Sequence, residues 1–256
     1  IAGVSFFTGS FDGNGHTITL DGTEAGVFFN IGVGGEVRNV KVSGGVDAGN
    51  SLGFVLAVTN YGTIRGCVST ASVSGHLSGG LVYNNCGTLE HSYATGSVIS
   101  ENLGGGLIGV NGVGGSGTPG TIAQYCFATG EVTSVSSYSG GIAGHNNPQA
   151  LLDHCVALNP RLSGNADPHR IALKITDGVN SGVYSNNYAL AEITLFGAPV
   201  LGGAADNEDG ADVTLAEAQT QSWWSDPSTG IWKDVWGDHG AGGLPDYDHP
   251  WVWDSV

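Results

Sequence analysis

The segment GGLVYNNCGTLEHSYATGSV, residues 79–98, joins a glycine pair, a short apolar run, two asparagines, a turn and a second, alternating run. Its second half recurs along the chain. The related runs are EVRNVKVSGGV at 36–46, TIRGCVSTASV at 63–73, IAQYCFATGEV at 122–132 and the drifting LLDHCVALNP at 151–160. Their fifth residues are Val40, Cys67, Ser92, Cys126 and Cys155, spaced by 27, 25, 34 and 29 residues. The segment is therefore one unit of an internal repeat.

A second recurring element precedes four of these runs. Glycine-led segments at residues 53–60, 79–85, 105–111 and 140–146 each end in an aligned asparagine: Asn60, Asn85, Asn111 and Asn146. A unit of about 25 residues cannot bury its own apolar face, so neighbouring units must stack. The units lack both the 3.6-residue period of helical repeats and a leucine-rich frame. The pattern predicts a parallel β-helix of six or seven coils, about 4.8 Å apart, with the asparagines hydrogen-bonded along the stack.

The residue types suit such a stack. Small side chains at Cys67, Ser92, Cys126 and Cys155 are expected to fill one inward position of a narrow core. Cys126 and Cys155 should lie on neighbouring coils, within reach of a disulfide that an exported location would permit. The glycine pairs are expected at corners where φ is positive. The spacing of the cysteines does not support a zinc site.

The segments GGLVYNN, GGLIGVN and GGIAGHN, with SYATGSV and CFATGEV after the first two, resemble the GLUG-motif repeats of bacterial and archaeal exported and surface proteins. The likeness runs over roughly residues 8–253 and includes TGSFDGNGHTITL at 8–20. It implies an all-β, right-handed parallel β-helix and no catalytic motif. The chain departs from the family pattern at Ala57–Val58 and Tyr83, where glycine is usual, and at the insertion VNGVGGSGTPG, residues 110–120.

Composition restricts the partners. Lys plus Arg number 7 against 23 Asp plus Glu, a net charge of −16, so phosphate backbones and anionic lipids would be repelled. No apolar run is long enough for a membrane span. Because the chain starts at Ile1 without Met or a signal peptide, we expect a processed fragment of a larger protein.

Catalytic candidates are sparse. A lyase-type site needs clustered carboxylates beside a basic residue, and a glycosidase needs two carboxylates ~5–10 Å apart. Arg38 and Arg65 share a register, but no acidic cluster is evident beside them. The candidate carboxylates scatter over other registers: Asp12, Asp21, Glu24, Glu36, Asp47, Glu90, Glu101 and Glu131.

The C-terminal part offers two further candidate sites. The acidic turn of Asp206, Glu208, Asp209 and Asp212 could wrap calcium, although an acidic surface turn needs no metal. The aromatic residues Trp223, Trp224, Trp232, Trp236, Tyr247, Trp251 and Trp253 could stack on sugars or pack on the last coil as a cap. We therefore expect one domain, with repeats over residues 1–201 and a Trp-rich C-terminal cap over 202–256.

Together these features predict a non-enzymatic extracellular or cell-surface module of adhesin type, which binds a glycan or a host or matrix protein. The insertion and the tail are the expected places for specificity, since loops on a rigid scaffold carry function. Two alternatives stay open. One is a polysaccharide-active lyase or hydrolase, and the weaker one is an ice-binding protein, suggested by the aligned hydroxyls of Ser43, Thr70, Thr95 and Thr129.

Overall fold

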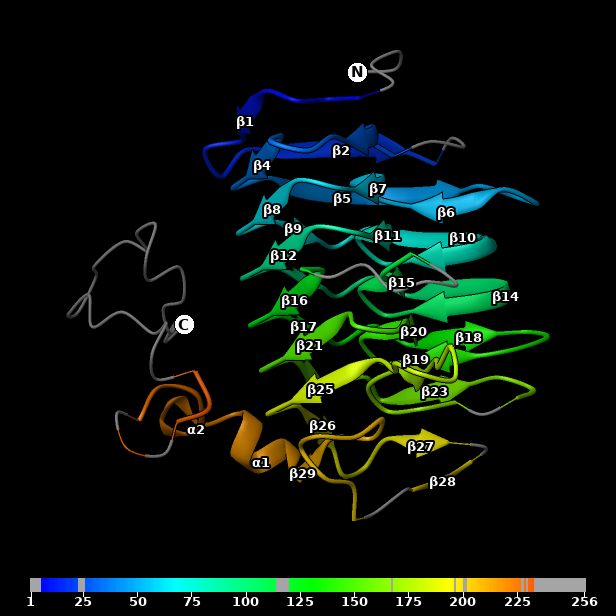
Figure 1. The fold of residues 1–256 in the computed structure, drawn as a ribbon, viewed down its shortest axis with the longest axis vertical. Helices are drawn as coiled ribbons and strands as arrows, with labels where there is room; N and C mark the ends of the chain where they lie inside the picture. The colour runs from blue at the N-terminus through cyan, green and yellow to red at the C-terminus, as the bar shows by residue number, and fades with distance from the viewer. Residues whose placement is uncertain are drawn as a thin grey trace.

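The computed structural model describes residues 6–22, 26–113, 120–166, 168–195, 197–199, 202–226, 228 and 230–232. Within these ranges the chain winds into a stack of parallel coils, with the N-terminal coil at one end and two short helices beside the last coils (Figure 1). In the described residues, six of the seven coils contribute strands to all three sheets that run along the stack, and the last coil contributes to two of them. The predicted all-β parallel β-helix is confirmed.

The first sheet is the simplest of the three. In the described part of the chain it holds seven strands, one for each coil, and every pairing is parallel. In each of these strands the central residue points into the core. The strands are β1 (Ser10–Asp12), β4 (Glu36–Arg38), β8 (Thr63–Arg65), β12 (Thr88–Glu90), β16 (Ile122–Gln124), β21 (Leu151–Asp153) and β25 (Val183–Ser185).

The second sheet carries the longest strands, and 16 strands are described in it. All its pairings are parallel except that of β27 with β28. Its strands are β2 (Thr17–Asp21), β5 (Lys41–Asp47), β6 (Leu52–Phe54), β9 (Val68–Ser69), β10 (Ser72–Gly79), β13 (Tyr93–Ala94), β14 (Val98–Gly105), β17 (Phe127–Ala128), β18 (Val132–Ser134), β19 (Ser139–Gly140), β22 (Val156–Ala157), β23 (Arg161–Ser163), β26 (Tyr188–Leu190), β27 (Thr194–Leu195), β28 (Ala198–Pro199) and β29 (Ala211–Val213).

The third sheet bears the glycine-led segments. Its described strands are β3 (Phe28–Ile31), β7 (Ala57–Asn60), β11 (Val82–Asn85), β15 (Ile108–Asn111), β20 (Ala143–Asn146) and β24 (Leu173–Lys174). Each equivalent residue sits beside its counterpart one coil away, as Val82 does beside Ala57 and Ile108. One continuous hydrophobic core runs inside the three sheets, with residues such as Val42, Ile64 and Leu89 fully buried.

The glycine pairs work differently from the prediction. The pairs that open the glycine-led segments at 79–80, 105–106 and 140–141 do not have the positive φ that was expected of them. Instead, a Cβ at Gly79 would collide with the carbonyl oxygen of Val82, and one at Gly105 with that of Ile108. Glycine is therefore needed because the backbone folds back on itself at the corner, and the left-handed conformation is used elsewhere.

The left-handed corner lies between the first and second sheets. One residue in each of six successive coils has φ between 49° and 60° there: Asn39, Gly66, His91, Tyr125, His154 and Asn186. Glycine adopts this conformation readily, and asparagine and histidine are enriched in it, whereas it is unusual for a bulky residue such as tyrosine. At the middle coils the rings stack, with centroids 5.4 Å apart for His91–Tyr125 and 4.9 Å for Tyr125–His154. Ring stacking between coils compensates for part of the conformational cost.

Beyond the last coils the chain forms α1 (Leu215–Ala218) and α2 (Gln221–Ser225). Thr214 and Glu217 form a capping box at the start of α1. A Trp-rich cluster follows, in which Trp224 and Trp232 contact Phe127, Val156 and other residues on the outer side of the second sheet. The cluster thus covers the side of the last coils.

Candidate functional site

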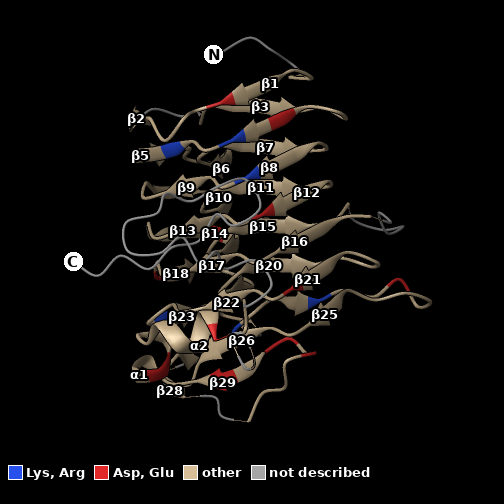
Figure 2. Cartoon of the chain, turned by 90° about the vertical axis from the view of Figure 1, so that its left-hand side faces the viewer, with Lys and Arg blue, Asp and Glu red and all other residues tan. Residues whose placement is uncertain are grey.

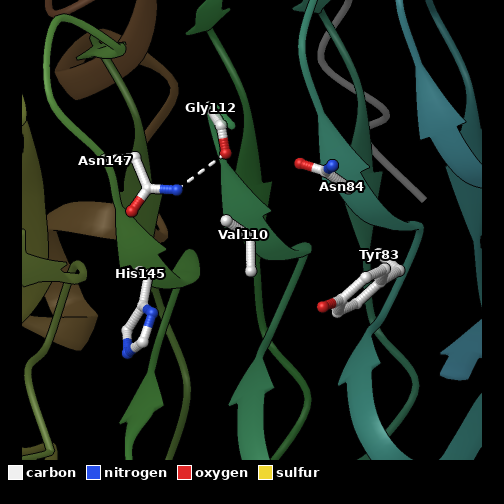
Figure 3. A pocket seen from close by; sticks show the side chains of 6 residues that line it. All are labelled: Tyr83, Asn84, Val110, Gly112, His145 and Asn147. Atoms are coloured by element: carbon white, nitrogen blue, oxygen red, sulfur yellow. Dashed lines mark hydrogen bonds between the residues drawn. The ribbon is translucent and has the colours of Figure 1, made fainter. Parts of the chain in front are cut away.

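A hollow of about 250 Å³ opens on the third sheet, across β11, β15 and β20. That is room for roughly eight waters at the density of the liquid. Figure 3 shows Tyr83 and His145 on opposite sides of it, with Val110 between them. The lining residues are Tyr83, Asn84, Val110, Gly112, His145 and Asn147.

The column that holds Tyr83 continues with glycine on the next two coils. The strand register places Gly109 beside Tyr83 on the next coil, and Gly144 beside Gly109 on the coil after that. The Tyr83 ring leans over Gly109, where a Cβ would lie 2.7 Å from Tyr83 Cδ2. A residue larger than glycine at position 109 would therefore displace the ring.

Two polar atoms at the hollow lack partners among the described residues. They are Asn84 Oδ1 and His145 Nε2, both shielded from solvent. In Figure 3 the Asn84 oxygen points toward the Val110 and Gly112 side. Asn147 is satisfied, since its Nδ2 donates to the Gly112 carbonyl at 2.8 Å and closes one end of the hollow. Among the described residues, these two atoms are the polar groups at the hollow that still need a hydrogen-bond partner.

The described lining is also electrically neutral. Burial lowers the pKa of His145 below its ordinary value, so the imidazole is uncharged at neutral pH. Burial likewise raises the pKa of the Tyr83 phenol, which stays protonated. Amides, an imidazole and a phenol therefore present hydrogen-bonding groups without a full charge, on a protein whose net charge is −16.

Two departures from the repeat pattern meet here. Tyr83 replaces the glycine found at positions 109 and 144, and the insertion of residues 110–120 starts at the hollow with Val110 and Gly112. Residues 114–119 lie outside the described part of the chain. Both departures are visible in the sequence. Nothing in the sequence indicates that His145 and Asn147, two coils away from Tyr83, line the same hollow.

The aligned asparagines form what we call the asparagine ladder: Asn60, Asn85, Asn111 and Asn146. All four are fully buried. Each Nδ2 donates to the Oδ1 of the next at 2.9 Å, from Asn60 to Asn85, Asn111 and Asn146 in turn. Each Nδ2 also donates to a backbone carbonyl: Thr88, Ile122, Leu151 and Val183, at 2.9 to 3.2 Å. The ladder is structural and offers no group to a ligand.

The prediction about the charged residues of the first sheet is wrong. The sequence reading found no acidic cluster in the register of Arg38 and Arg65, but the structure aligns Asp12, Glu90 and Asp153 with them. In Figure 2, β1, β8 and β12 of this column lie one above another. The carboxylates are engaged: Asp12 with Arg38 at 3.0 Å, Glu90 with Arg65 at 3.2 Å and with Gln124 at 2.8 Å. Asp153 accepts from the Asn186 amide at 3.3 Å, and its other oxygen lies 3.0 Å from His154 Nδ1.

The acidic turn contacts the preceding coils through separate partners. Asp212 pairs with the fully buried Arg170 at 2.7 Å, and Glu208 with Lys174 at 3.4 Å. Asp209 lies 3.6 Å from His169, and Asp206 accepts the Asn186 N–H at 3.2 Å. Although burial raises the pKa of Asp209 and Asp212, these partners hold both below the ordinary value. Among the described residues, no group of three or more His, Cys, Asp or Glu side chains is arranged to hold a metal ion.

The tryptophans in the described part of the tail do not present open ring faces. Trp224 and Trp232 are 7% and 1% exposed, and Trp223 is half-buried. The indole N–H of Trp232 donates to the His154 carbonyl at 2.8 Å, and that of Trp224 to Ala218. The idea that Trp224 and Trp232 stack on sugars is therefore corrected, because their rings are already packed against the coils. Trp236, Tyr247, Trp251 and Trp253 lie outside the described residues.

Two further groups of candidate residues remain, the inward column of cysteines and the column of hydroxyl side chains. Cys67, Cys126 and Cys155 are fully buried free thiols in one column with Ser92, whose hydroxyl accepts the Cys67 N–H at 3.0 Å. Of the predicted hydroxyl column, Ser43 lies in β5, and Thr70, Thr95 and Thr129 directly follow β9, β13 and β17, each donating its N–H to a carbonyl of the preceding coil. Within the described residues, no helix has the length and apolar character of a membrane span.

Comparison with known proteins gives one informative match. The chain is 36% identical over 104 residues to Halomucin of Haloquadratum walsbyi (strain DSM 16790 / HBSQ001). The match covers 38% of this chain and 1% of Halomucin, so the chain corresponds to a very small part of that protein's length. No family model matches the chain, and the GLUG resemblance therefore stays a prediction. The match suggests a surface-type protein, with which a β-solenoid is compatible.

Proposed function

We propose that this chain is a non-enzymatic module of an extracellular or cell-surface protein, in which a rigid β-solenoid presents a ligand-binding face. The observation that carries the proposal is the hollow at Tyr83 and His145. It is the place where two departures from an otherwise regular repeat coincide, and its lining offers unpartnered polar atoms. Insertions in a repeat protein map to loops on one face, which is often the binding face, because loops on a rigid scaffold carry function.

Three further observations support a display role. The asparagine ladder and the continuous core join the coils rigidly. The carboxylates of Asp12, Glu90 and Asp153 are held by neighbouring side chains, which favours a structural role over general acid–base chemistry. The similarity to Halomucin favours a surface protein of greater length, in which this chain would be one part. A bound glycan or an extracellular protein is the proposed type of partner.

The cellular part of the proposal can be tested directly. Antibodies raised against the purified chain should label intact cells of the source organism without permeabilisation. Treating intact cells with a protease should remove the label, while an intracellular marker survives. Labelling that appears only after permeabilisation would overturn the proposed location.

A further inference from the structure

We propose that the hollow across β11, β15 and β20 is a binding site for one neutral sugar residue, with Tyr83 as its aromatic wall and Asn84 and His145 as its hydrogen-bonding groups. This inference deepens the proposed function and rests on it for the site. It adds the chemical class of the ligand and the role of each residue.

The shape of the site sets the size of the ligand. Tyr83 and His145 lie two coils apart, which is about 9.6 Å along the stack at the usual spacing of parallel strands. The Val110 side chain lies between the two rings. A hollow of about 250 Å³ holds one pyranose ring and no long oligomer.

The chemistry of the lining sets the class of the ligand. The described lining residues carry no full charge, so the site offers nothing to compensate a phosphate, a carboxylate or an ammonium group. It does offer an aromatic ring and a valine beside unpartnered amide and imidazole atoms. A neutral pyranose matches both the apolar and the polar groups of the lining. Its C–H face packs on an aromatic ring, and its hydroxyl edge supplies donors and acceptors.

The unpartnered atoms indicate what the sugar would contribute. Asn84 Oδ1 is an acceptor and needs a donated hydroxyl. His145 Nε2 accepts or donates according to the tautomer, and a hydroxyl serves either way. The Tyr138 ring lies 5.2 Å from the His145 ring and helps to hold the imidazole in place. Both atoms are shielded in the described structure, so the Asn84 and His145 side chains would have to turn toward the ligand before its hydroxyls could pair with them.

The test titrates the purified full chain with the methyl glycosides of glucose, galactose and mannose and with N-acetylglucosamine, followed by saturation-transfer NMR and calorimetry. At least one should bind with a Kd on the order of 1 mM. Tyr83→Gly introduces the residue that the repeat carries at positions 109 and 144, so the variant should fold, as circular dichroism will verify. It should weaken binding at least tenfold, whereas Tyr83→Phe keeps the ring and should retain most of the affinity.

Tyr61→Ala is the matched control, because Tyr61 is exposed outside the hollow. Its affinity should equal that of the unmodified chain. No binding of any of the four sugars at ten times the expected Kd would overturn the proposal. So would equal affinity in a folded Tyr83→Gly variant, or tighter binding of glucuronate, glucosamine or a neutral peptide. Surface labelling that fails while sugar binding persists would refute the proposed location alone.

Discussion

Replacing Asn85 by alanine would measure how much the asparagine ladder stabilises the stack. Asn85 is fully buried and makes three ladder hydrogen bonds: it accepts from Asn60 at 2.9 Å and donates to Asn111 at 2.9 Å and to the Ile122 carbonyl at 3.1 Å. At about 1 kcal/mol net for each bond, their loss costs about 3 kcal/mol. The Asn111 oxygen and the Ile122 carbonyl also lose a buried donor, so the expected total is about 3–5 kcal/mol.

A graded comparison separates hydrogen bonding from a general loss of packing. Asn146 stands at the end of the ladder, where it accepts one bond from Asn111 and donates one to the Val183 carbonyl. Asn146→Ala therefore removes two ladder bonds, at a cost of about 2 kcal/mol, together with a contact to the Tyr184 side chain. Asn85→Asp keeps the shape but loses both donated bonds and buries a charge, so it should destabilise the fold at least as much as Asn85→Ala.

Equilibrium unfolding in urea, followed by circular dichroism and by tryptophan fluorescence, gives the free energies of unfolding. Coincident transitions would justify two-state analysis, and separated ones would show that the variant uncouples the coils. The reasoning fails if Asn85→Ala costs less than about 1 kcal/mol, or no more than Asn146→Ala.

Three further outcomes are expected. Asp212→Asn leaves the Arg170 guanidinium buried without this counter-charge, and should lower the free energy of unfolding by about 3–5 kcal/mol. Arg170→Met should lower it by less. Equal losses in urea unfolding would contradict the buried ion pair. Burial, with a smaller effect of Arg65, lowers the pKa of His91 to about 4, so the unfolded chain binds more protons below pH ~6.5. Between pH 7 and 5 the unmodified protein should therefore lose about 2 kcal/mol more stability than His91→Phe, and parallel pH profiles would rule this out. Burial raises the pKa of the Cys67 thiol to about 12, so iodoacetamide should alkylate it only in denaturant, as mass spectrometry would show.

The repeat made much of the fold predictable. A residue that returns to the same position in every coil must suit the same environment, which is why the alignment of the asparagines and of the small inward residues anticipated their places in the stack. The acidic column of the first sheet was missed for a related reason. Glu90 and Arg65 differ in charge, so a comparison by residue type hides that they share a register, and only position reveals it.

Other features depend on contacts between parts of the chain that follow no shared pattern. The separate partners of Asp209 and Asp212 depend on His169 and Arg170, which lie some forty residues earlier in the chain. Trp232 contacts the outer side of the second sheet rather than an open end of the stack. The hollow brings together Tyr83 and His145, which lie two coils apart. None of these relations leaves a local signature in composition or periodicity.

The asparagine ladder gives the stack a direction. Every amide donates toward the C-terminal coils and accepts from the N-terminal side, so the row of side-chain dipoles is vectorial, as are the parallel strands around it. The two ends of such a rod are not interchangeable: one terminates in an acceptor and the other in a donor. Further coils can extend it only head to tail, in the order of the chain, and two copies placed head to head would set like ends against each other. Growth by tandem duplication within one polypeptide is one form of elongation that keeps this order.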